Sequence, residues 1–303
     1  MGAAPLVVVA NPAAGNGKAG TVIGKLEHLL TEAAIPHEIA LSSSGHDLEE
    51  RVRAAAAGGA TRVGCLGGDG TVGLAANGLS GTEARLAVFP SGTADDFAHS
   101  IGLRNLESAV RACADGPTVR IDTAKVTTRD STRRYVAVAS CGFDSEVNEA
   151  ANAMSMRIGS TGTYVAALVK TLSRFTPALF TIDIDGVVHS GAHMLVAIGN
   201  STSYGGGMKV TPNASVVDGQ LDACMLAALG KGAFLRAFPR VFRGTHVTHP
   251  AVTMARGKRI HIETDRHVMV YADGERVGPT PATFEVEPSS LSVFVGPNAR
   301  AVR

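Results

Sequence analysis

The stretch Gly67-Gly68-Asp69-Gly70-Thr71 decides the fold, because this glycine-rich turn joins a predicted strand to a predicted helix. The apolar run 62–66 precedes it and a helix-like segment, 72–79, follows it. Glycines let backbone N–H groups approach an anion closely, and the positive end of the helix dipole adds to the attraction. The pattern predicts a phosphate site, although a tight turn with Thr71 as a helix cap would use the same residues.

Around this turn, residues 5 to about 122 alternate short apolar strands with helix-length segments. Strands of this kind are typical of a parallel sheet that is covered by helices. Ligands of such sheets bind beyond the carboxyl ends of the strands. The spacing predicts strands at 5–10, 37–41, 62–66 and 86–90, and helices at 18–33, 48–57 and 72–79.

From about Asp122 the hydrophobic period changes toward two, which predicts a largely antiparallel β domain. Asp-Gly pairs and glycine-rich breaks separate the alternating runs, as in β-hairpins. The segment 164–175 is the one helix-like exception, with Tyr164, Leu168, Leu172 and Phe175 on one face. The alternating runs are 181–186, 259–262, 267–270 and 291–295.

Length and composition set further limits. A chain of 303 residues is expected to form two domains, and its net charge of +1 gives no bulk attraction for nucleic acid. Its 4 cysteines are far apart in the sequence, so neither a disulfide framework nor a zinc site is predicted. A signal sequence and a transmembrane segment are not predicted either, and a cytoplasmic location is expected.

Several common nucleotide motifs are excluded by their context. Gly15, Gly17 and Gly20 form GxGxxG, but Gly15 comes five positions after the first strand ends at Ala10, and the second strand is followed by serines rather than an acidic residue. A P-loop would need a glycine at Pro12 and a hydroxyl at position 19. The catalytic motifs of protein kinases and the GxSxG motif of serine hydrolases are also absent.

A third loop, 90–98, also follows a predicted strand, and its sequence is PSGTADDFA. With NPAAG at 11–15 and GGDGT at 67–71, it resembles the catalytic domain of diacylglycerol kinases and the related bacterial lipid and sphingosine kinases. The resemblance covers nearly the whole chain. It continues in CGFD at 141–144, YGGGM at 204–208, VDGQLD at 217–222 and ADGE at 272–275.

This resemblance implies a two-domain α/β protein with its active site in the cleft between the domains. One domain would be a Rossmann-like parallel α/β nucleotide-binding domain formed by residues 1–122 plus 289–303. The other would be an antiparallel β-sandwich lipid-substrate domain formed by residues 123–288. ATP would be the co-substrate and Mg²⁺ the metal ion.

The resemblance also implies roles for individual residues. Glu275 would be the general base on the lipid hydroxyl, with Asp273 beside it. The magnesium ligands would be Ser215, Asp218 and Gln220, extended by Asp69, Asp96 and Asp122. The nucleotide contacts would be Asn11, Pro12, Ala13, Ala14, Gly15, Ser42, Gly67, Gly68, Asp69, Gly70, Thr71 and Thr93.

The pair Asp273 and Glu275 has two interpretations. Residues two apart on an extended strand point to the same face, which would place both carboxylates at one site. An Asp-Gly pair after an apolar run also predicts a hairpin turn, and the local pattern alone favours that turn. Phosphoryl transfer needs positioning and charge neutralisation as well as a proton acceptor. The carboxylate pair would supply only the acceptor, so the catalytic interpretation depends on the other motifs.

The leading prediction is an ATP-dependent kinase that converts diacylglycerol to phosphatidic acid. The alternatives are a kinase of a sphingosine-like or phosphatidylglycerol-like lipid, an NAD kinase, and a nucleotide-binding regulatory protein without turnover. Two departures from the family pattern keep the last alternative open, namely Gly73-Leu74 after GGDGT and Asp95 in place of asparagine.

The expected partner is a lipid substrate at a membrane surface, with peripheral contact to the inner face of the membrane and a homodimer as open alternatives. The segment 231–243 interleaves phenylalanines with basic residues. We expect it to be a helix that buries its phenylalanines and bends at Pro239, and a membrane-facing helix is the second interpretation.

Overall fold

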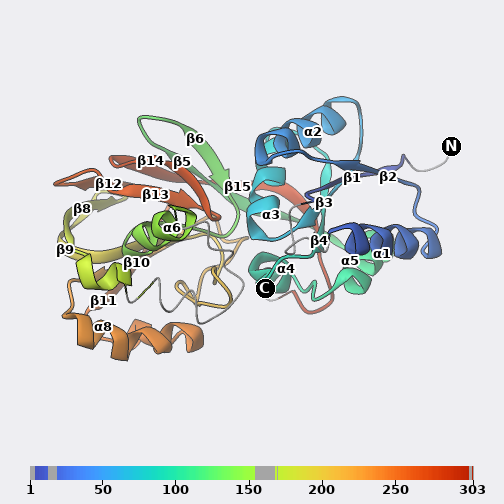
Figure 1. The fold of residues 1–303 in the computed structure, drawn as a ribbon. Coiled ribbons are helices and arrows are strands. Elements are labelled where there is room, and N and C mark those ends of the chain that lie inside the picture. The colour runs from blue at the N-terminus through green and yellow to red at the C-terminus, as the bar shows by residue number, and fades with distance from the viewer. Residues whose placement is uncertain (1–3, 13–18, 154–167, 169, 300–301, 303) are drawn as a thin grey trace. The chain divides into compact units, whose positions relative to one another are not determined.

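The computed structural model describes residues 4–12, 19–153, 168, 170–299 and 302 (Figure 1). The chain divides into two compact units. The first unit contains Met1–Thr123, Ser215–Gly219 and Glu287–Arg303, and the second contains Ala124–Ala214 and Gln220–Val286. The sequence prediction placed the boundaries after residues 122 and 288 and did not assign Ser215–Gly219 to the first domain.

The first unit is built on a parallel sheet, as predicted. Its strands lie in the order β2-β1-β3-β4-β15, and every pairing between neighbours is parallel. The central strands are almost wholly buried, which explains why they read as continuous apolar runs. The strands are β1 (Leu6–Ala10), β2 (His37–Leu41), β3 (Arg62–Gly67), β4 (Arg85–Pro90) and β15 (Ala282–Phe294), whose residues Ser292 and Val293 pair with β4.

Five described helices follow the strands of this unit. They are α1 (Ala19–Glu32), α2 (Gly45–Ala57), α3 (Asp69–Gly78), α4 (Asp96–Ser100) and α5 (Leu106–Asp115). The side chain of Ser44 caps α2 by accepting the Asp47 N–H, and Asn105 forms a capping box with Ser108 at α5. Gly78 lets α3 cross α2 closely, because a Cβ atom there would lie 2.7 Å from the Glu49 carbonyl oxygen.

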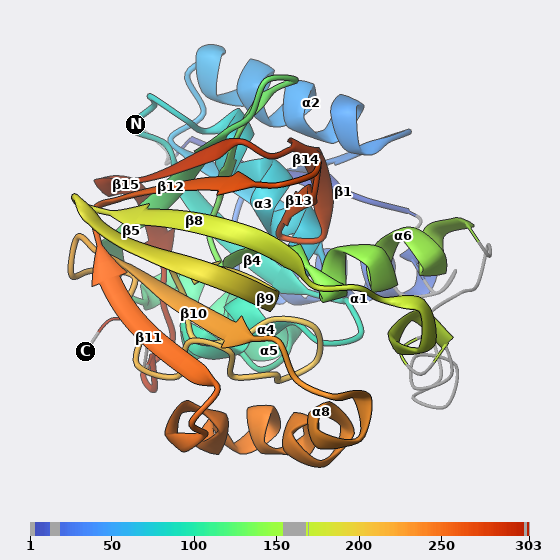
Figure 2. The ribbon, with the colours of Figure 1, turned by 90° about the vertical axis from the view of Figure 1, so that its left-hand side faces the viewer.

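The second unit is antiparallel, and its strand β8 alternates buried and more exposed side chains, whereas β7 is buried at every position. The long strand β9 pairs with β8 along its first half and with β7 and β10 along its second half (Figure 2). The strands are β5 (Thr118–Thr127), which begins in the first unit, β6 (Thr132–Tyr135), β7 (Val138–Gly142), β8 (Ala178–Ile184), β9 (Val187–Gly199), β10 (Leu221–Ala227), β11 (Val252–Gly257), β12 (Arg259–Thr264), β13 (Met269–Ala272) and β14 (Glu275–Pro279).

Helical segments cover part of this β structure. They are α6 (Phe143–Ala153), α8 (Lys231–Ala237) and two 3₁₀ helices, η2 (Phe238–Arg243) and η3 (Thr245–Thr248). The helix predicted over 231–243 therefore changes to 3₁₀ geometry at Phe238-Pro239, where proline lacks the N–H of an α-helical bond. Leu168, Leu172 and Phe175 of the predicted helix 164–175 are buried in a cluster with Phe143, while Tyr164 lies outside the described residues.

All 4 cysteines are buried and unpaired. No helix among the residues that the structure describes combines the length and the apolar character needed to cross a bilayer.

Candidate active site

The glycine motif lies where β3 ends and α3 begins. Gly67 is the last residue of β3 and Gly68 is the N-cap of α3. No side chain caps this helix, so the N–H groups of its first turn present their positive field to whatever lies beyond the sheet edge. The interpretation of Thr71 as a cap is therefore wrong. Thr71 is buried, and its side chain packs so closely over Gly67 that no Cβ atom would fit there.

The loops 67–71 and 90–98 meet through Gly68 and Gly92. A Cβ atom on Gly92 would lie 2.6 Å from Gly68 Cα, and one on Gly68 would lie 3.2 Å from Gly92 Cα. The two backbones can approach this closely only because neither residue has a side chain. The N–H of Ser91 also donates to the Gly67 carbonyl at 3.1 Å. The loops 67–71 and 90–98 therefore meet at one edge of the sheet, beyond the ends of β3 and β4.

Asp69 links the same two loops by its side chain. Its carboxylate accepts the backbone N–H of Phe97 at 2.9 Å and that of Asp96 at 3.2 Å, at the start of α4. Asp69 thus caps a helix other than the one it begins, and negative charge is favourable at that position. The predicted role of Asp69 as a magnesium ligand stays a prediction.

Asp95 occupies the position where the family pattern has asparagine. Its φ of 53° is a left-handed conformation, which Asn and Asp adopt more readily than most side chains. Its Oδ1 accepts the Gly92 N–H at 2.9 Å. Burial raises the pKa of the Asp95 carboxyl to about 6, and the charges of Asp69 and Asp96 add to that rise. The ionised Asp95 carboxylate therefore repels the carboxylates of Asp69 and Asp96 beside the loops 67–71 and 90–98.

We expect Asp95→Asn to raise the melting temperature at pH 7 and to flatten its pH dependence between about pH 4 and pH 6. An unfolded Asp ionises near pH 3.9, so the native chain binds more protons in this window and its stability falls as the pH rises. Asparagine keeps the acceptor for Gly92 and the left-handed φ. Thermal unfolding across this pH range measures the effect, with the exposed Asp130→Asn as control. Identical profiles for wild type and Asp95→Asn would contradict it.

The amino-terminal loop is only partly described. The N–H of Asn11 donates to the Leu66 carbonyl at 3.2 Å, which ties the loop after β1 to the end of β3. Pro12 is exposed, and Ala13, Ala14 and Gly15 lie outside the described residues. Ser42 is buried, and its Oγ donates to the Ala10 carbonyl at 3.1 Å. Thr93 is exposed in the third loop.

Asp122 is buried and holds two distant segments of the first unit. Its Oδ2 accepts the Gly219 N–H and its Oδ1 accepts the Ser289 N–H, each at 2.7 Å. Its own N–H donates to the Val216 carbonyl at 2.6 Å. Asp122 therefore anchors both ends of the turn 216–219, which carries the predicted magnesium ligand Asp218.

The remaining predicted magnesium ligands are distributed as follows. Asp218 is exposed on the turn that Asp122 anchors, Ser215 is half-buried at its start, and Gln220 is the first residue after the turn. Asp96 is buried at the start of α4. Among the described residues no group of three or more His, Cys, Asp or Glu side chains could hold a metal. A carboxylate with hydroxyl and carbonyl oxygens still fits the chemistry of a hard cation.

Asp273 and Gly274 form a hairpin turn between β13 and β14. Their φ angles are 48° and 83°, as in a type I′ turn, and Ala272 pairs with Glu275 across it. The prediction that Asp273 and Glu275 share one face of an extended strand is wrong, because the turn reverses the chain between them. Glu275 is exposed at the start of β14.

The Asp273 carboxylate is buried and accepts three backbone N–H groups. They belong to Val136 at 2.8 Å, Ala137 at 3.0 Å and Val138 at 3.2 Å. Sequence analysis missed this role, since nothing in the local pattern connects the turn to residues 136–138. Asp273 fixes the hairpin, and Glu275 is the carboxylate of the pair that is exposed to solvent.

An apolar pocket of the second unit was also missed. The space that its atoms leave empty, open solvent at its mouth included, is about 740 Å³. Most of its lining is aromatic or aliphatic, and α6, α8 and η2 contribute part of it together with β9, β10, β11 and the segments between these elements. The lining residues are Phe143, Asp144, Val147, Leu168, Leu195, Tyr204, Met208, Val210, Cys224, Leu226, Phe234, Ala237, Phe238, Val241, His246, His249 and Val252.

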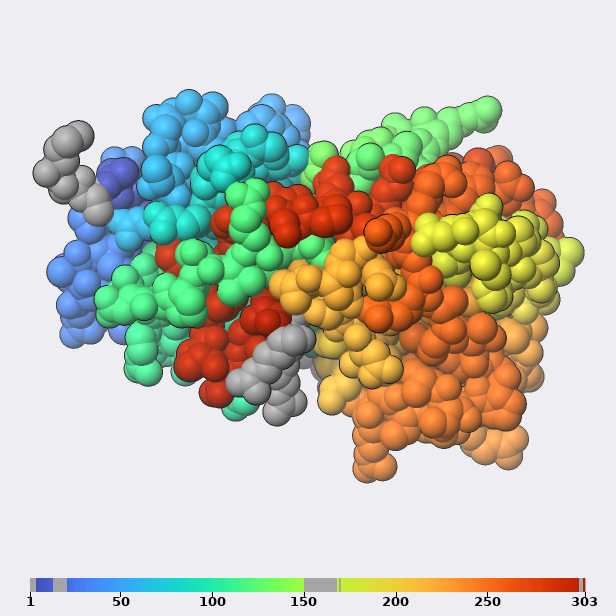
Figure 3. Space-filling model, turned by 180° about the vertical axis from the view of Figure 1, so that it is seen from behind, coloured from blue at the N-terminus to red at the C-terminus, as the bar shows by residue number. Residues whose placement is uncertain are grey.

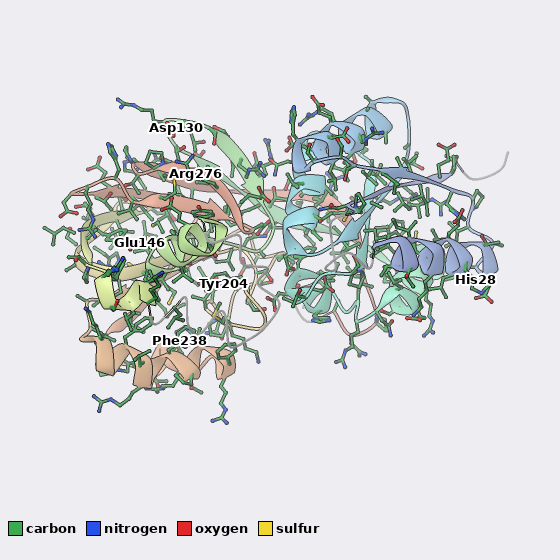
Figure 4. All side chains as sticks on the ribbon, viewed as in Figure 1. His28, Asp130, Glu146, Tyr204, Phe238 and Arg276 are labelled. Carbon is green, nitrogen blue, oxygen red and sulfur yellow. The ribbon has the colours of Figure 1, made fainter. Side chains whose placement is uncertain are left out.

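One polar pair stands out in this apolar lining. The Tyr204 hydroxyl donates to Asp144 Oδ2 at 3.0 Å, and Figure 4 shows Tyr204 between α6 and the segment that carries Phe238. Burial raises the pKa of the Asp144 carboxyl, while hydrogen bonds from Ser140, Tyr204 and the Ser145 N–H oppose that rise. The motifs CGFD and YGGGM contain these residues, and they are the signal by which the pair could have been found.

Comparison with known proteins agrees with this geometry. The model of the diacylglycerol kinase catalytic domain matches residues 5–126, and that of the YegS C-terminal NAD kinase β-sandwich-like domain matches residues 137–295. A diacylglycerol kinase of Mycobacterium tuberculosis is 35% identical over 297 residues, which cover 95% of this chain and 94% of the relative. The chain belongs to the diacylglycerol kinase family. As a member of it, the chain is an enzyme, a lipid kinase of the phosphotransferase class.

Other relatives of the diacylglycerol kinase family extend the match. A diacylglycerol kinase of Bacillus subtilis is 26% identical over 223 residues, covering 72% of each chain. A solved Bacillus anthracis protein is 25% identical and superposes with a TM-score of 0.79 over 97% of both chains. A second, a diacylglycerol kinase of the same organism at 22% identity, shares the fold with a TM-score of 0.74. The predicted architecture, an α/β domain and a β-sandwich domain, is confirmed.

Proposed function

We propose that this kinase transfers the γ-phosphate of ATP to the hydroxyl of diacylglycerol and so forms phosphatidic acid. The observation that carries the proposal is the uncapped amino terminus of α3, bordered by the contact between Gly68 and Gly92. Backbone N–H groups, the helix dipole and a surface without side chains are what a polyphosphate requires.

The glycine contact would also keep the space beside the helix terminus free for a bulky anion. A side chain on either glycine would fill the space between the two loops, so Gly68 and Gly92 form a cradle in which backbone atoms meet, with the Asp95 carboxylate beside them. Asp69 keeps the cradle rigid by tying the start of α3 to the start of α4. Rigid donors cost little reorganisation when charge develops on the transferred group.

Magnesium would be held through the turn that Asp122 anchors, with Asp218, Ser215 and Gln220 as oxygen donors. When bound, the ion neutralises charge on the phosphates. Asp122 itself has both carboxylate oxygens engaged by backbone N–H groups, so its part is to fix the turn.

Glu275 would accept the proton of the lipid hydroxyl. The carboxylate is exposed directly after a two-residue turn, and the turn is fixed by the three N–H groups that Asp273 binds. A general base must be held at a constant position relative to its substrate, and a short hairpin with a buried anchor supplies this rigidity. Asp273 is thus a positioning residue for Glu275.

The apolar pocket supports a lipid acceptor. Most of its lining is hydrocarbon or aromatic, and its few polar side chains, Asp144, Tyr204, His246 and His249, suit a substrate with long chains and a small polar head. NAD is polar at nearly every part, with hydroxylated riboses, a charged pyrophosphate and a charged nicotinamide ring, and it would leave these apolar walls without an apolar partner. The pocket therefore favours a lipid kinase over the NAD kinase alternative.

Transfer from labelled ATP to a panel of acceptors tests the proposal. The panel contains diacylglycerol, sphingosine, ceramide, phosphatidylglycerol and NAD, each with and without Mg²⁺. We expect label in phosphatidic acid only, and only with the metal. Label on another lipid would correct the substrate, label on NAD would overturn the lipid assignment, and ATP binding without transfer to any acceptor would favour the regulatory alternative.

A further inference from the structure

The segment formed by α8 and η2 has two apolar faces. Phe234, Phe238 and Val241 point inward, where they line the pocket. Leu235 is 42% exposed and Phe242 is 45% exposed, so these two large apolar side chains point to solvent. The prediction that this segment buries its phenylalanines is thus right for Phe234 and wrong for Phe242. Phe234 and Phe238 already occupy the inner face of the segment, so Phe242 lies on its outer face.

Basic residues surround the exposed apolar side chains. Lys231, Arg236 and Arg243 are exposed on the same segment. Within the described part of the chain, neither Arg236 nor Arg243 is paired with a carboxylate. We call the exposed side chains Lys231, Leu235, Arg236, Phe242 and Arg243 the basic strip.

The basic strip lies in a stretch of the sequence without acidic residues. From Ala223 to Ile262 the chain contains no Asp or Glu, whereas its Lys and Arg residues lie at 231–243 and 256–259, although the net charge of the whole chain is only +1. Arg256 is paired with Asp222, Arg259 lies 4.0 Å from Glu285, and Arg240 is held by the Thr245 carbonyl and the Thr248 hydroxyl. Lys231, Arg236 and Arg243 therefore have no acidic neighbour in their own segment, which is orange at the bottom of Figure 3.

We propose that the basic strip docks on the surface of an anionic lipid bilayer. Exposed aromatic and aliphatic side chains beside unpaired cations form the pattern by which interfacial helices bind membranes, with the apolar groups entering the headgroup region and the cations contacting anionic lipids. Figure 4 shows Phe238 on this segment at the lower edge of the second unit, away from the Asp130 turn.

Docking at the basic strip would bring the pocket close to its lipid substrate, and this step of the inference rests on the proposed function. The same few turns carry Phe234 and Phe238 on the pocket wall and Leu235 and Phe242 on the docking face. The pocket wall and the docking face are thus two faces of the same segment, so a pocket beside the docked strip would lie close to the bilayer surface. The acyl chains of an entering lipid are then shielded from water for most of the path, which lowers the barrier to entry.

Vesicle co-sedimentation without ATP tests the docking by itself. The probes are vesicles of phosphatidylcholine alone and of equal parts phosphatidylcholine and phosphatidylserine. We expect binding to the anionic vesicles and little to the neutral ones. Each cation near such a surface contributes about a fivefold gain in partitioning, so the double variant Arg236→Gln with Arg243→Gln is expected to bind roughly 25-fold more weakly. The double variant Leu235→Ser with Phe242→Ser is expected to lose roughly tenfold.

Matched controls come from the same unit. Arg129→Gln removes an exposed cation from the turn between β5 and β6, and Leu179→Ser removes an apolar side chain that is 57% exposed on β8. Both should bind like wild type. Equal binding of wild type to neutral and anionic vesicles, or unchanged binding of the Arg236→Gln/Arg243→Gln variant, would overturn the inference.

A second readout separates this inference from the proposed function. Phosphorylation of a short-chain diacylglycerol dispersed in water needs no bilayer, so all strip variants should retain it. If wild type phosphorylates no lipid but the strip variants still lose vesicle binding, the docking surface stands and the proposed function fails. If the strip variants lose the short-chain activity as well, while melting like wild type, the strip acts in the site itself and the docking proposal fails.

Discussion

Replacing Glu275 by Gln is expected to lower kcat by roughly 10²- to 10⁴-fold, the usual contribution of a positioned general base. The substitution keeps the size and polarity of the side chain but removes its capacity to accept a proton. Because Glu275 is exposed after a turn that Asp273 holds, neither the fold nor the nucleotide loops should change. Steady-state transfer of label from ATP to diacylglycerol measures kcat, while thermal unfolding and ATP titration monitor the fold and the nucleotide site.

The matched control for this experiment is Glu263→Gln. Glu263 is also an exposed carboxylate on a strand of the second unit, and we assign it no part in the chemistry. It should leave kcat within about twofold of wild type, as expected for a surface substitution. If Glu275→Gln retains substantial turnover under conditions where Glu263→Gln is also normal, Glu275 is not the base.

Replacing Asp273 by Ala is expected to destabilise the protein by at least about 3 kcal/mol. The N–H groups of Val136, Ala137 and Val138 would lose their only charged acceptor, and each buried unsatisfied donor costs roughly 1–3 kcal/mol. Alanine at a φ of 48° adds roughly 1–2 kcal/mol of strain. Thermal unfolding should show a decrease in Tm of roughly 10 °C for a unit of this size.

Asp185→Ala separates the strain from the buried hydrogen bonds. Asp185 occupies the same kind of Asp-Gly turn with a φ of 49°, and its carboxylate accepts two N–H groups, but it is exposed to solvent. Water can replace those two bonds, so we expect a loss of only about 1–2 kcal/mol, mostly from strain. Equal losses in the two variants would show that the buried carboxylate of Asp273 has no special part in stability.

The first unit was the more predictable part of the molecule. Its central strands β1, β3 and β4 are almost wholly buried, so they appear in the sequence as continuous apolar runs, and a parallel order follows from the helices between the strands. The glycine motif could be located at the end of β3 because turn chemistry is local. The partner of Asp69 could not be predicted, since the N–H groups it binds come from a loop 27 residues further along the chain.

The second unit shows the limits of local patterns more clearly. The Asp273-Gly274 pair indicated a hairpin, and the hairpin is present, but the buried role of the carboxylate depends on residues about 135 positions earlier. The apolar pocket has a similar origin. Its walls come from α6, β9, β10, α8, η2 and the segments between them, and in each of these elements the lining residues look like ordinary core residues. The sequence periodicity of side chains that line a pocket is the same as that of side chains packed in the core, so the pocket could not be predicted.

The contacts of Asp122 with Gly219 and Ser289 bear on the order in which the two units fold. The chain leaves the first unit twice, for Ala124–Ala214 and for Gln220–Val286, and each return is held by one oxygen of this aspartate, through Gly219 and Ser289. The last strand of the parallel sheet, β15, follows the second return. During synthesis, then, the unit that emerges first is the last to be completed, and its edge at β4 stays open until the rest of the chain has folded. Contacts of such long sequence separation form slowly, so completion of the first unit should limit the rate of refolding.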